Sequence, residues 1–277
     1  MEFRTIVNIE KGPFQIEPLE EMLFVGSCFA DSIGRRFVDD KFRAVVNPFG
    51  VMYNPASILH SVERCDASPR TAVFTLGTNH VYRLKETGEI VDNCEKRPAR
   101  LFEEEALGVE ACADYLQRAI GMLRQRRPDV RIILTVSPIR YRKYGYHESQ
   151  LSKATLLLAV QTILQSPSTL HPPPVTSHHP PITYFPAYEI MMDELRDYRF
   201  YADDMLHPSA QAVEYIWQRF GEMFFSERTR QFLDAWRPIK AALGHKPFAP
   251  DSAEYQAFLA DARAKEAALI RAYDTRH

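Results

Sequence analysis

The chain has 277 residues, of which 45% are hydrophobic and 25% charged, and its formal net charge is −2. This composition fits one large globular domain with an ordinary core, and the near-neutral charge gives no reason to expect nucleic acid or an acidic membrane surface as a partner. The apolar runs are too short to span a bilayer and the first residues lack the pattern of a secretory signal, so we expect a cytoplasmic protein that binds neither membrane nor nucleic acid.

The cysteines indicate neither a disulfide framework nor a zinc ribbon. They stand at positions 28, 65, 94 and 112 and lack the paired spacing of either type of site. Residues 166–181 form a loop rich in proline and histidine, but histidines in a proline-stiffened surface loop usually bind no metal. We therefore predict no metal and no other cofactor. The oligomeric state is not predicted.

Along the chain, short apolar runs alternate with stretches that have the spacing of helices. The expected elements are, in order, a strand at 22–25, a helix over about 31–40, a strand at 42–46, a helix opened by Asn54 and Pro55, a strand at 72–76, a hairpin at 81–91, a helix over 109–126, a strand at 131–136, a helix over about 150–165, a strand at 182–185, a helix near 187–196 and a helix from 208 or 209 to about 225. Residues 229–277 are charged and helix-prone, so we divide the chain into a domain at 1–228 and a C-terminal extension.

Strands separated by helices predict a three-layer α/β domain with a five-stranded, mainly parallel sheet. In such a sheet the carboxyl ends of the strands line the crevice that binds ligands. The segments expected at that edge are Gly26-Ser27-Cys28, the turn at 47–50, the turn at 77–80, Ser137-Pro138 and the loop with Asp203-Asp204.

The turn after the first strand holds two side chains that can act as nucleophiles, Ser27 and Cys28. Gly26 allows a sharp turn, and the helix that follows offers unpaired backbone N–H groups to an anionic centre. A hydroxyl or thiol held there is a candidate for covalent catalysis. Small residues also fill such turns for steric reasons alone, so the prediction needs a base elsewhere in the chain.

A candidate base lies in the loop before the last helix of the predicted domain. Asp204 precedes His207 by three residues, and this spacing lets the carboxylate reach the Nδ1–H of the ring, so that Nε2 faces a nucleophile. Alternatively, Asp204 caps the following helix and His207 lies at the surface.

Taken together, these features have the layout of the SGNH, or GDSL-type, hydrolase superfamily, over about residues 22–225. More narrowly, the chain resembles the GSCFA family, whose name corresponds to the run Gly26-Ser27-Cys28-Phe29-Ala30. Other runs similar to that family are those at 75–78, 150–154, 184–189 and 193–199.

The resemblance implies a flavodoxin-like SGNH-hydrolase fold and an ester-cleaving site. It implies that His207 is the general base and Asp204 its orienting partner. The oxyanion donors would be the backbone N–H of the nucleophile, the backbone N–H of Gly50 and the side-chain amide of Asn79. His80 departs from the superfamily, which often has aspartate at that position.

The resemblance leaves the nucleophile undecided between two neighbours. The superfamily's first motif, Gly-Asp-Ser, has its nucleophile two positions after the glycine, which corresponds to Cys28; a turn that is one residue tighter makes Ser27 the nucleophile. The register favours Cys28. A thiol beside an imidazole at a helix N-terminus is expected to have a lowered pKa.

Further residues are candidates for substrate binding. Arg140 follows the strand at 131–136 and can bind a carboxylate or phosphate, although a solvated loop cation is the simpler interpretation. Asn93 lies in a polar loop that can form the rim of the site. Three tyrosines, at 141, 144 and 146, can form an aromatic wall.

We therefore expect a hydrolase that acts on an ester of a small molecule or carbohydrate, through an acyl-enzyme on Cys28 or Ser27. An acyltransferase that uses the same site is the alternative. A binding module that kept the fold without turnover is a hypothesis of a different class.

Overall fold

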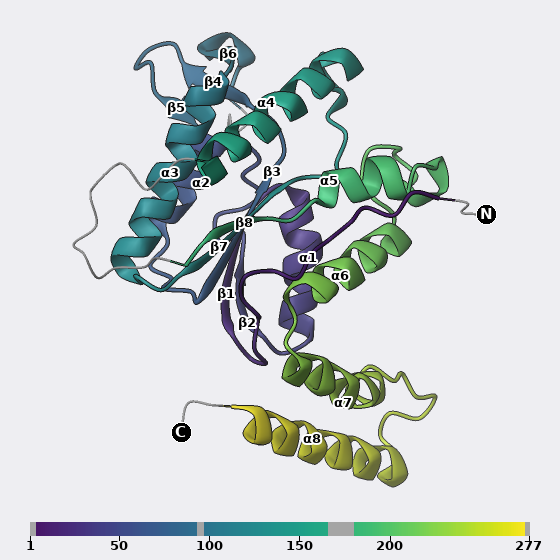
Figure 1. Ribbon diagram of the computed structural model, residues 1–277. Helices are drawn as coiled ribbons and strands as arrows, with labels where there is room; N and C mark the ends of the chain where they lie inside the picture. Colours follow the sequence, from purple (N-terminus) through teal and green to yellow (C-terminus); the bar gives the residue numbers. More distant parts are fainter. Residues whose placement is uncertain (1–3, 93–96, 166–179, 275–277) are drawn as a thin grey trace.

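Five parallel strands form the central sheet, in the order β2-β1-β3-β7-β8 (Figure 1). The computed structural model describes residues 4–92, 97–165 and 180–274. The strands are β1 (Glu21–Gly26), β2 (Arg43–Val46), β3 (Thr71–Leu76), β7 (Arg131–Val136) and β8 (Ile182–Tyr184). Every residue of β3 and β7 is buried, as expected of central strands covered on both faces. The strand order is that of flavodoxin-like sheets, so the predicted parallel sheet is confirmed.

Helices cover both faces of the sheet and complete the predicted three-layer architecture. The helices on one face are α2 (Pro55–Arg64), α3 (Val109–Arg126) and α4 (Tyr146–Gln165). Those on the other are α1 (Cys28–Asp39), the short α5 (Ala187–Glu189) and α6 (Ala210–Phe224). The second face is rich in aromatic residues: the ring of Phe37 lies 5.0 Å from Phe24 and 4.7 Å from Trp217, between centroids. Each such pair contributes about 0.5–1.5 kcal/mol beyond its buried area.

Three helices differ from their predicted ranges. α1 begins at Cys28 rather than near 31, because the side chain of Ser27 caps it. α4 begins at Tyr146 rather than near 150. The helix expected near 187–196 is α5 followed by a wide π-helical turn (Ile190–Glu194). That turn carries the Glu194 carboxylate inward, where it accepts hydrogen bonds from the Val7 N–H and the Tyr215 hydroxyl.

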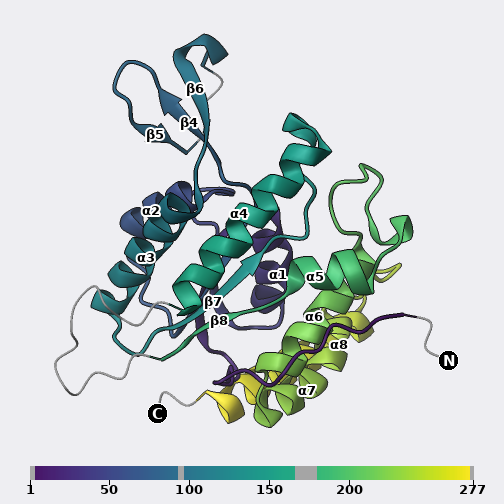
Figure 2. The ribbon, with the colours of Figure 1, turned by 45° about the horizontal axis from the view of Figure 1, so that its top comes forward.

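A small antiparallel sheet follows β3 and projects beyond the carboxyl ends of the parallel strands (Figure 2). The predicted hairpin supplies β4 (His80–Leu84) and β5 (Ile90–Val91). The third strand, β6 (Phe102–Ala106), is not among the predicted elements; it pairs with β4 over five residues although it carries three consecutive glutamates. The small sheet therefore stands next to the edge predicted to hold the site.

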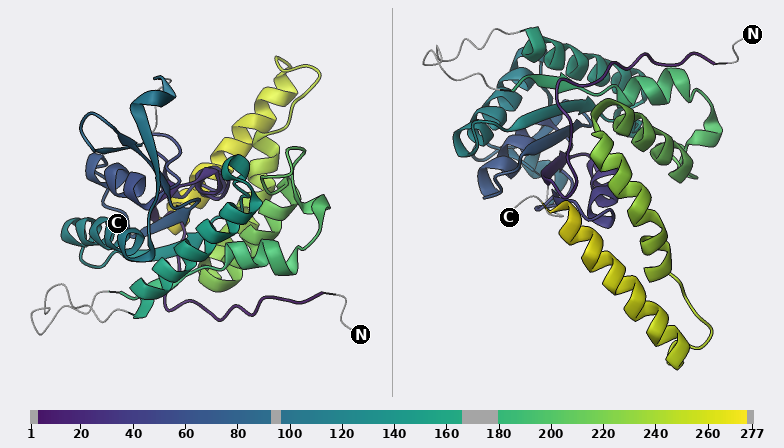
Figure 3. Two further views of the ribbon diagram at one scale, coloured as in Figure 1. Left: turned by 90° about the horizontal axis from the view of Figure 1, so that it is seen from above. Right: turned by 60° about the horizontal axis from the view of Figure 1, so that its bottom comes forward.

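Two antiparallel helices, α7 (Glu227–Leu243) and α8 (Ala253–Tyr273), form the C-terminal part and extend away from the sheet (Figure 3). They are attached near the amino end of β2 by ion pairs of Lys41 with Glu266 (2.6 Å) and of Arg43 with Asp274 (2.8 Å). This attachment is remote from the carboxyl ends of the strands. The predicted domain boundary at 228 stays a prediction.

Within the residues that the structure describes, no helix is both long enough and apolar enough to cross a bilayer.

Candidate active site

The turn between β1 and α1 requires glycine at position 26. The φ angle of Gly26 is +142°, and a Cβ atom there would lie 2.2 Å from the Thr75 carbonyl oxygen. The Gly26 N–H donates to Asn47 Oδ1 (2.9 Å), and the next N–H, that of Ser27, donates to the Thr75 carbonyl (3.0 Å). The turn is thus held against both neighbouring strands, as a site for precise chemistry requires.

The Ser27 side chain is buried and serves the turn itself. Its Oγ accepts a hydrogen bond from the Phe29 N–H (3.2 Å), which makes Ser27 the N-cap of α1, and it lies 2.9 Å from Thr75 Oγ1. Only 3% of the residue is exposed. This geometry gives Ser27 a structural role in the turn.

Replacing Ser27 by alanine is expected to reduce stability more than activity. The substitution removes a helix cap and a buried hydroxyl partner of Thr75, which together are worth about 1–2 kcal/mol. Urea unfolding and turnover of an aryl ester measure the two effects. The matched control is Ser252→Ala, which removes the N-cap of α8 far from this turn. Complete loss of turnover in Ser27→Ala would identify Ser27 as the nucleophile.

Cys28 is the first residue of α1, and it is partly exposed with a free thiol. Burial raises the pKa of this thiol, and the nearby Asp31 carboxylate raises it further. The expectation of a lowered pKa is therefore wrong, because the loss of solvent and the negative charge of Asp31 outweigh the hydrogen bond from the Cys28 backbone N–H. A nucleophilic Cys28 would need a base that removes its proton during the reaction.

Asn47 links the turn to the first turn of α1. Its Nδ2 donates to Asp31 Oδ1 (2.7 Å), while its Oδ1 accepts the Gly26 N–H. The sequence indicated only that the strand ends in a turn at 47–50. The positive φ of Asn47, +38°, is a conformation that asparagine tolerates better than most residues.

The loop before α6 holds Asp204 and His207 as a hydrogen-bonded pair. Asp204 Oδ2 lies 2.5 Å from His207 Nδ1, and Oδ1 accepts the backbone N–H groups of His207 and Leu206, each at 2.9 Å. The backbone N–H of His207, then that of Leu206 and then the ring, lower the pKa of Asp204 to about 2. The alternative that Asp204 caps α6 is wrong, because Ser209 accepts the Ala212 N–H and caps that helix. His207 does lie at the surface, as the same alternative held, with 42% of its side chain exposed.

Two of the three predicted oxyanion donors, the Gly50 N–H and the Asn79 amide, have partners of their own. The Gly50 N–H donates to the Asn47 carbonyl (2.9 Å) within a turn. The Asn79 amide donates to the Leu107 carbonyl (2.7 Å), and this residue is 5% exposed. One amide hydrogen of Asn79 remains, and helices leave their first N–H groups, such as that of Cys28, without intrahelical partners. Oxyanion binding by these groups stays a prediction.

Aromatic rings form a row at the same edge. Ring centroids are 6.0 Å apart for Tyr53 and Tyr141, 5.7 Å for Tyr141 and Tyr144, and 4.0 Å for Tyr144 and His80. Burial raises the pKa of Tyr141 and lowers that of His80. Two of the three predicted wall tyrosines therefore lie in one row, and His80, where the sequence departs from the superfamily, stacks on Tyr144.

The motif at 150–154 supplies two polar side chains that sequence reasoning missed. Ser152 Oγ contacts Thr78 Oγ1 and accepts the Asn79 N–H, both at 3.0 Å. The buried Lys153 donates to the carbonyls of Gly77 (2.7 Å) and Ser137 (2.8 Å), at the carboxyl ends of β3 and β7. α4 thereby fixes both strand ends. The adjacent polar residues Ser152 and Lys153, within an apolar helix, are the sequence signal that could have indicated these contacts.

Arg140 lies beside the loop of the Asp204–His207 pair. Its backbone N–H donates to the Leu206 carbonyl (3.0 Å), and its side chain lies over the ring of Tyr146 (4.3 Å). Asn93 and the histidines at 171, 178 and 179 lie outside the described residues. Within the described ranges, no three histidine, cysteine or acidic side chains are grouped so as to hold a metal ion.

Solved structures with a similar arrangement include two esterases. A carbohydrate esterase family 3 protein from Talaromyces cellulolyticus is 11% identical with a TM-score of 0.43, and a mutant of an acetyl esterase with acetate ion is 12% identical with a TM-score of 0.43. Each alignment covers 77% of this chain and 98% of the other.

No curated protein matches the sequence. The model of the GSCFA family matches residues 21–70 and 67–220, and the model of the GSCFA domain protein C-terminal domain matches residues 236–275. These matches cover most of the chain and include the turn, the aromatic row and the Asp204–His207 loop. This chain belongs to the GSCFA family.

Proposed function

We propose that this protein cleaves esters by forming an acyl-enzyme on Cys28. The observation that carries the proposal is the hydrogen bond between Asp204 and His207 Nδ1, in a loop next to the strand ends. It leaves Nε2 as the ring nitrogen that can accept a proton. The resemblance to SGNH-type hydrolases supports the same roles.

The reaction begins when His207 Nε2 takes the proton of the Cys28 thiol as its sulfur attacks the ester carbonyl carbon. The negative charge on the carbonyl oxygen is then stabilised by the backbone N–H of Cys28, because those of Phe29 and Ala30 already donate to Ser27. The tetrahedral intermediate collapses, the C–O bond to the alcohol breaks, and His207 returns its proton to the leaving alkoxide. Water, deprotonated by His207, attacks the thioester and releases the acid and the free thiol.

The structure favours Cys28 over Ser27 as the proposed nucleophile. The Ser27 hydroxyl is hydrogen-bonded to Phe29 and Thr75, whereas Cys28 is partly exposed. Its raised pKa means that the thiol is neutral at neutral pH, so the proposal depends on proton transfer to His207.

Trapping the acyl group tests this proposal. We expect that p-nitrophenyl acetate followed by acid quench leaves an acetyl group on Cys28, which mass spectrometry locates, and that His207→Ala slows its formation. Iodoacetamide should block both the label and turnover. Acetyl on Ser27, or equal labelling in His207→Ala, would contradict the mechanism. Product formed only when an acceptor alcohol is present would identify a transferase instead.

A further inference from the structure

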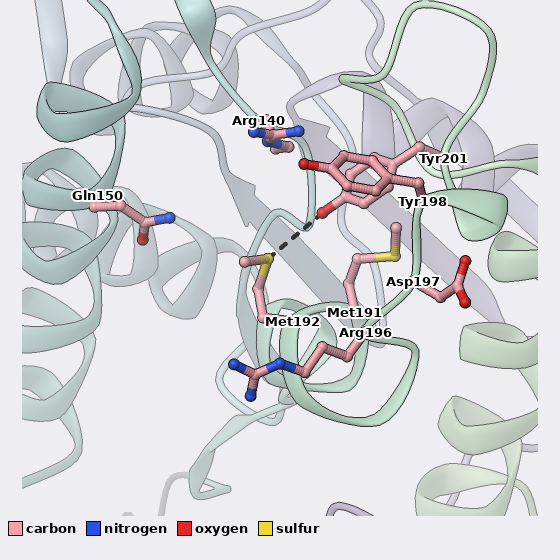
Figure 4. A pocket seen from close by; sticks show the side chains of 8 residues that line it. All are labelled: Arg140, Gln150, Met191, Met192, Arg196, Asp197, Tyr198 and Tyr201. Carbon is pink, nitrogen blue, oxygen red and sulfur yellow. Dashed lines mark hydrogen bonds between the residues drawn. The ribbon is translucent and has the colours of Figure 1, made fainter. Parts of the chain in front are cut away.

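A cavity of about 230 Å³ opens beside residues that contact the Asp204–His207 loop. Figure 4 shows the side chains that line it. It lies between α4, the π-helical turn after α5 and the segment at 196–201. The residues that line it are Arg140, Gln150, Met191, Met192, Arg196, Asp197, Tyr198 and Tyr201. None of the catalytic steps proposed above uses these side chains.

The loop that carries His207, the proposed base, is in contact with residues that line the cavity. Tyr201, which lines the cavity, is bridged to Pro208, and the next N–H, that of Ala202, donates to the His207 carbonyl (2.8 Å). Arg140, another lining residue, holds the same loop through the Leu206 carbonyl. A molecule in this cavity therefore lies next to the segment that positions His207.

Arg140 is a cation without an acidic partner among the described residues. Its guanidinium donates weakly to the Met205 carbonyl (3.3 Å) and lies over the rings of Tyr146 (4.3 Å) and Tyr201 (5.5 Å). Ring faces hold a guanidinium in place without neutralising it. Most of its five N–H donors remain for a ligand, in the planar arrangement that matches a carboxylate or phosphate.

The other walls fit a ligand body that is apolar or ring-shaped. Met192 and Tyr201 present a thioether and an aromatic face, and the Tyr201 hydroxyl lies 3.6 Å from Met192 Sδ. Arg196 approaches from the side opposite Arg140 (Figure 4). The acidic groups nearby already have partners: Asp197 accepts the Arg199 N–H, and Asp193 lies 3.7 Å from Arg196.

We propose that this cavity binds the anionic part of the substrate, so that the protein acts on esters carrying a carboxylate or phosphate on an apolar or ring-shaped body. This inference rests on the proposed ester cleavage. Arg140 would pair with the carboxylate or phosphate group of the substrate, and the methionine and tyrosine walls would contact its apolar or ring-shaped part. The ester bond to be cleaved would then lie next to the loop that carries His207.

Matched pairs of aryl esters test the proposal by turnover. The pairs are 4-acetoxybenzoate and its methyl ester, with the charge on the alcohol side, and 4-nitrophenyl hemisuccinate and its methyl ester, with the charge on the acyl side. We expect Arg140→Gln to lower the kcat/KM ratio of charged to neutral ester about 10- to 100-fold in one pair, mainly through KM. Arg140→Lys should restore part of it. Arg142→Gln, an exposed neighbouring cation, is the control and should leave the ratio unchanged.

Binding without turnover separates this proposal from the catalytic one. Phenyl phosphate and benzoate, measured by calorimetry, should bind the wild-type chain and bind at least about tenfold more weakly to Arg140→Gln. Equal binding by Arg140→Gln, or an unchanged ratio in both ester pairs, would overturn the anion site. If no ester of either pair is turned over while phenyl phosphate binding still depends on Arg140, the anion site stands and the proposed ester cleavage fails.

Discussion

Replacing His207 by alanine is expected to lower kcat/KM for a neutral aryl ester about 10³-fold while the protein remains folded. The ring is the proposed base for a thiol whose pKa is raised by burial and by Asp31, so its loss leaves a neutral nucleophile. The side chain of His207 is 42% exposed, and its removal leaves no buried cavity. Steady-state turnover and urea unfolding measure the two effects.

The chain offers a matched control for this substitution. His60 forms the same type of pair, with Nδ1 2.7 Å from Asp92 Oδ1, on the surface of α2. His60→Ala should leave turnover unchanged. If His207→Ala is also fully active, the catalytic interpretation is wrong and a binding module becomes the better description.

The charge of Asp204, the partner of His207, bears on how activity depends on pH. Because backbone N–H groups of His207 and Leu206 and the ring lower its pKa to about 2, Asp204 stays charged throughout the pH range in which the protein would be assayed. Any loss of activity between about pH 7 and pH 4 therefore arises from another group than Asp204.

The sheet could be predicted because its strands are continuous apolar runs bounded by turn residues, as at 131–136. Strand β6 could not, because residues 103–105 are glutamates and its order comes from pairing with β4 rather than from burial. The predicted start of α1 is too late because the small residues at 26–28 suggest a longer turn, whereas Ser27 caps a helix that begins at the next residue.

In the candidate site, too, only the contacts between residues close in the sequence could be predicted. Asp204 and His207 are three residues apart, so their contact follows from local spacing. The contacts of Lys153 join it to residues 76 and 16 positions away, and the Asn47 side chain reaches Gly26 across 21 positions. Such links depend on how strands are ordered in the sheet, and one sequence contains no direct signal of them.

Lys153 is the remaining group with a large expected effect, because it is a buried cation. Its Nζ donates to the Gly77 and Ser137 carbonyls and lies 5.8 Å from the Tyr188 ring centroid; among the described residues no carboxylate forms an ion pair with it. Burial lowers its pKa to about 7. In the unfolded chain the pKa of a lysine is about 10.4.

This difference predicts the direction in which stability changes with pH. Between about pH 7 and pH 10 the unfolded chain carries a proton on Lys153 that the folded chain lacks, so stability is lost as pH falls through this window and is flat below it. At about 1.4 kcal/mol per pH unit, the change is on the order of 4 kcal/mol over the window.

Lys153→Met should abolish that dependence. The variant has no titrating group but leaves the Gly77 and Ser137 carbonyls without their donor, at a cost of about 1–3 kcal/mol each. The unfolding free energy of the wild-type chain, minus that of the variant, should therefore rise from pH 7 to pH 10. Urea unfolding at both pH values measures it, with Lys265→Met, whose side chain is 64% exposed on α8, as the control. A difference that is the same at both pH values would show that Lys153 stays protonated in the folded chain, and its role would then be that of a permanent ammonium clamp on β3 and β7.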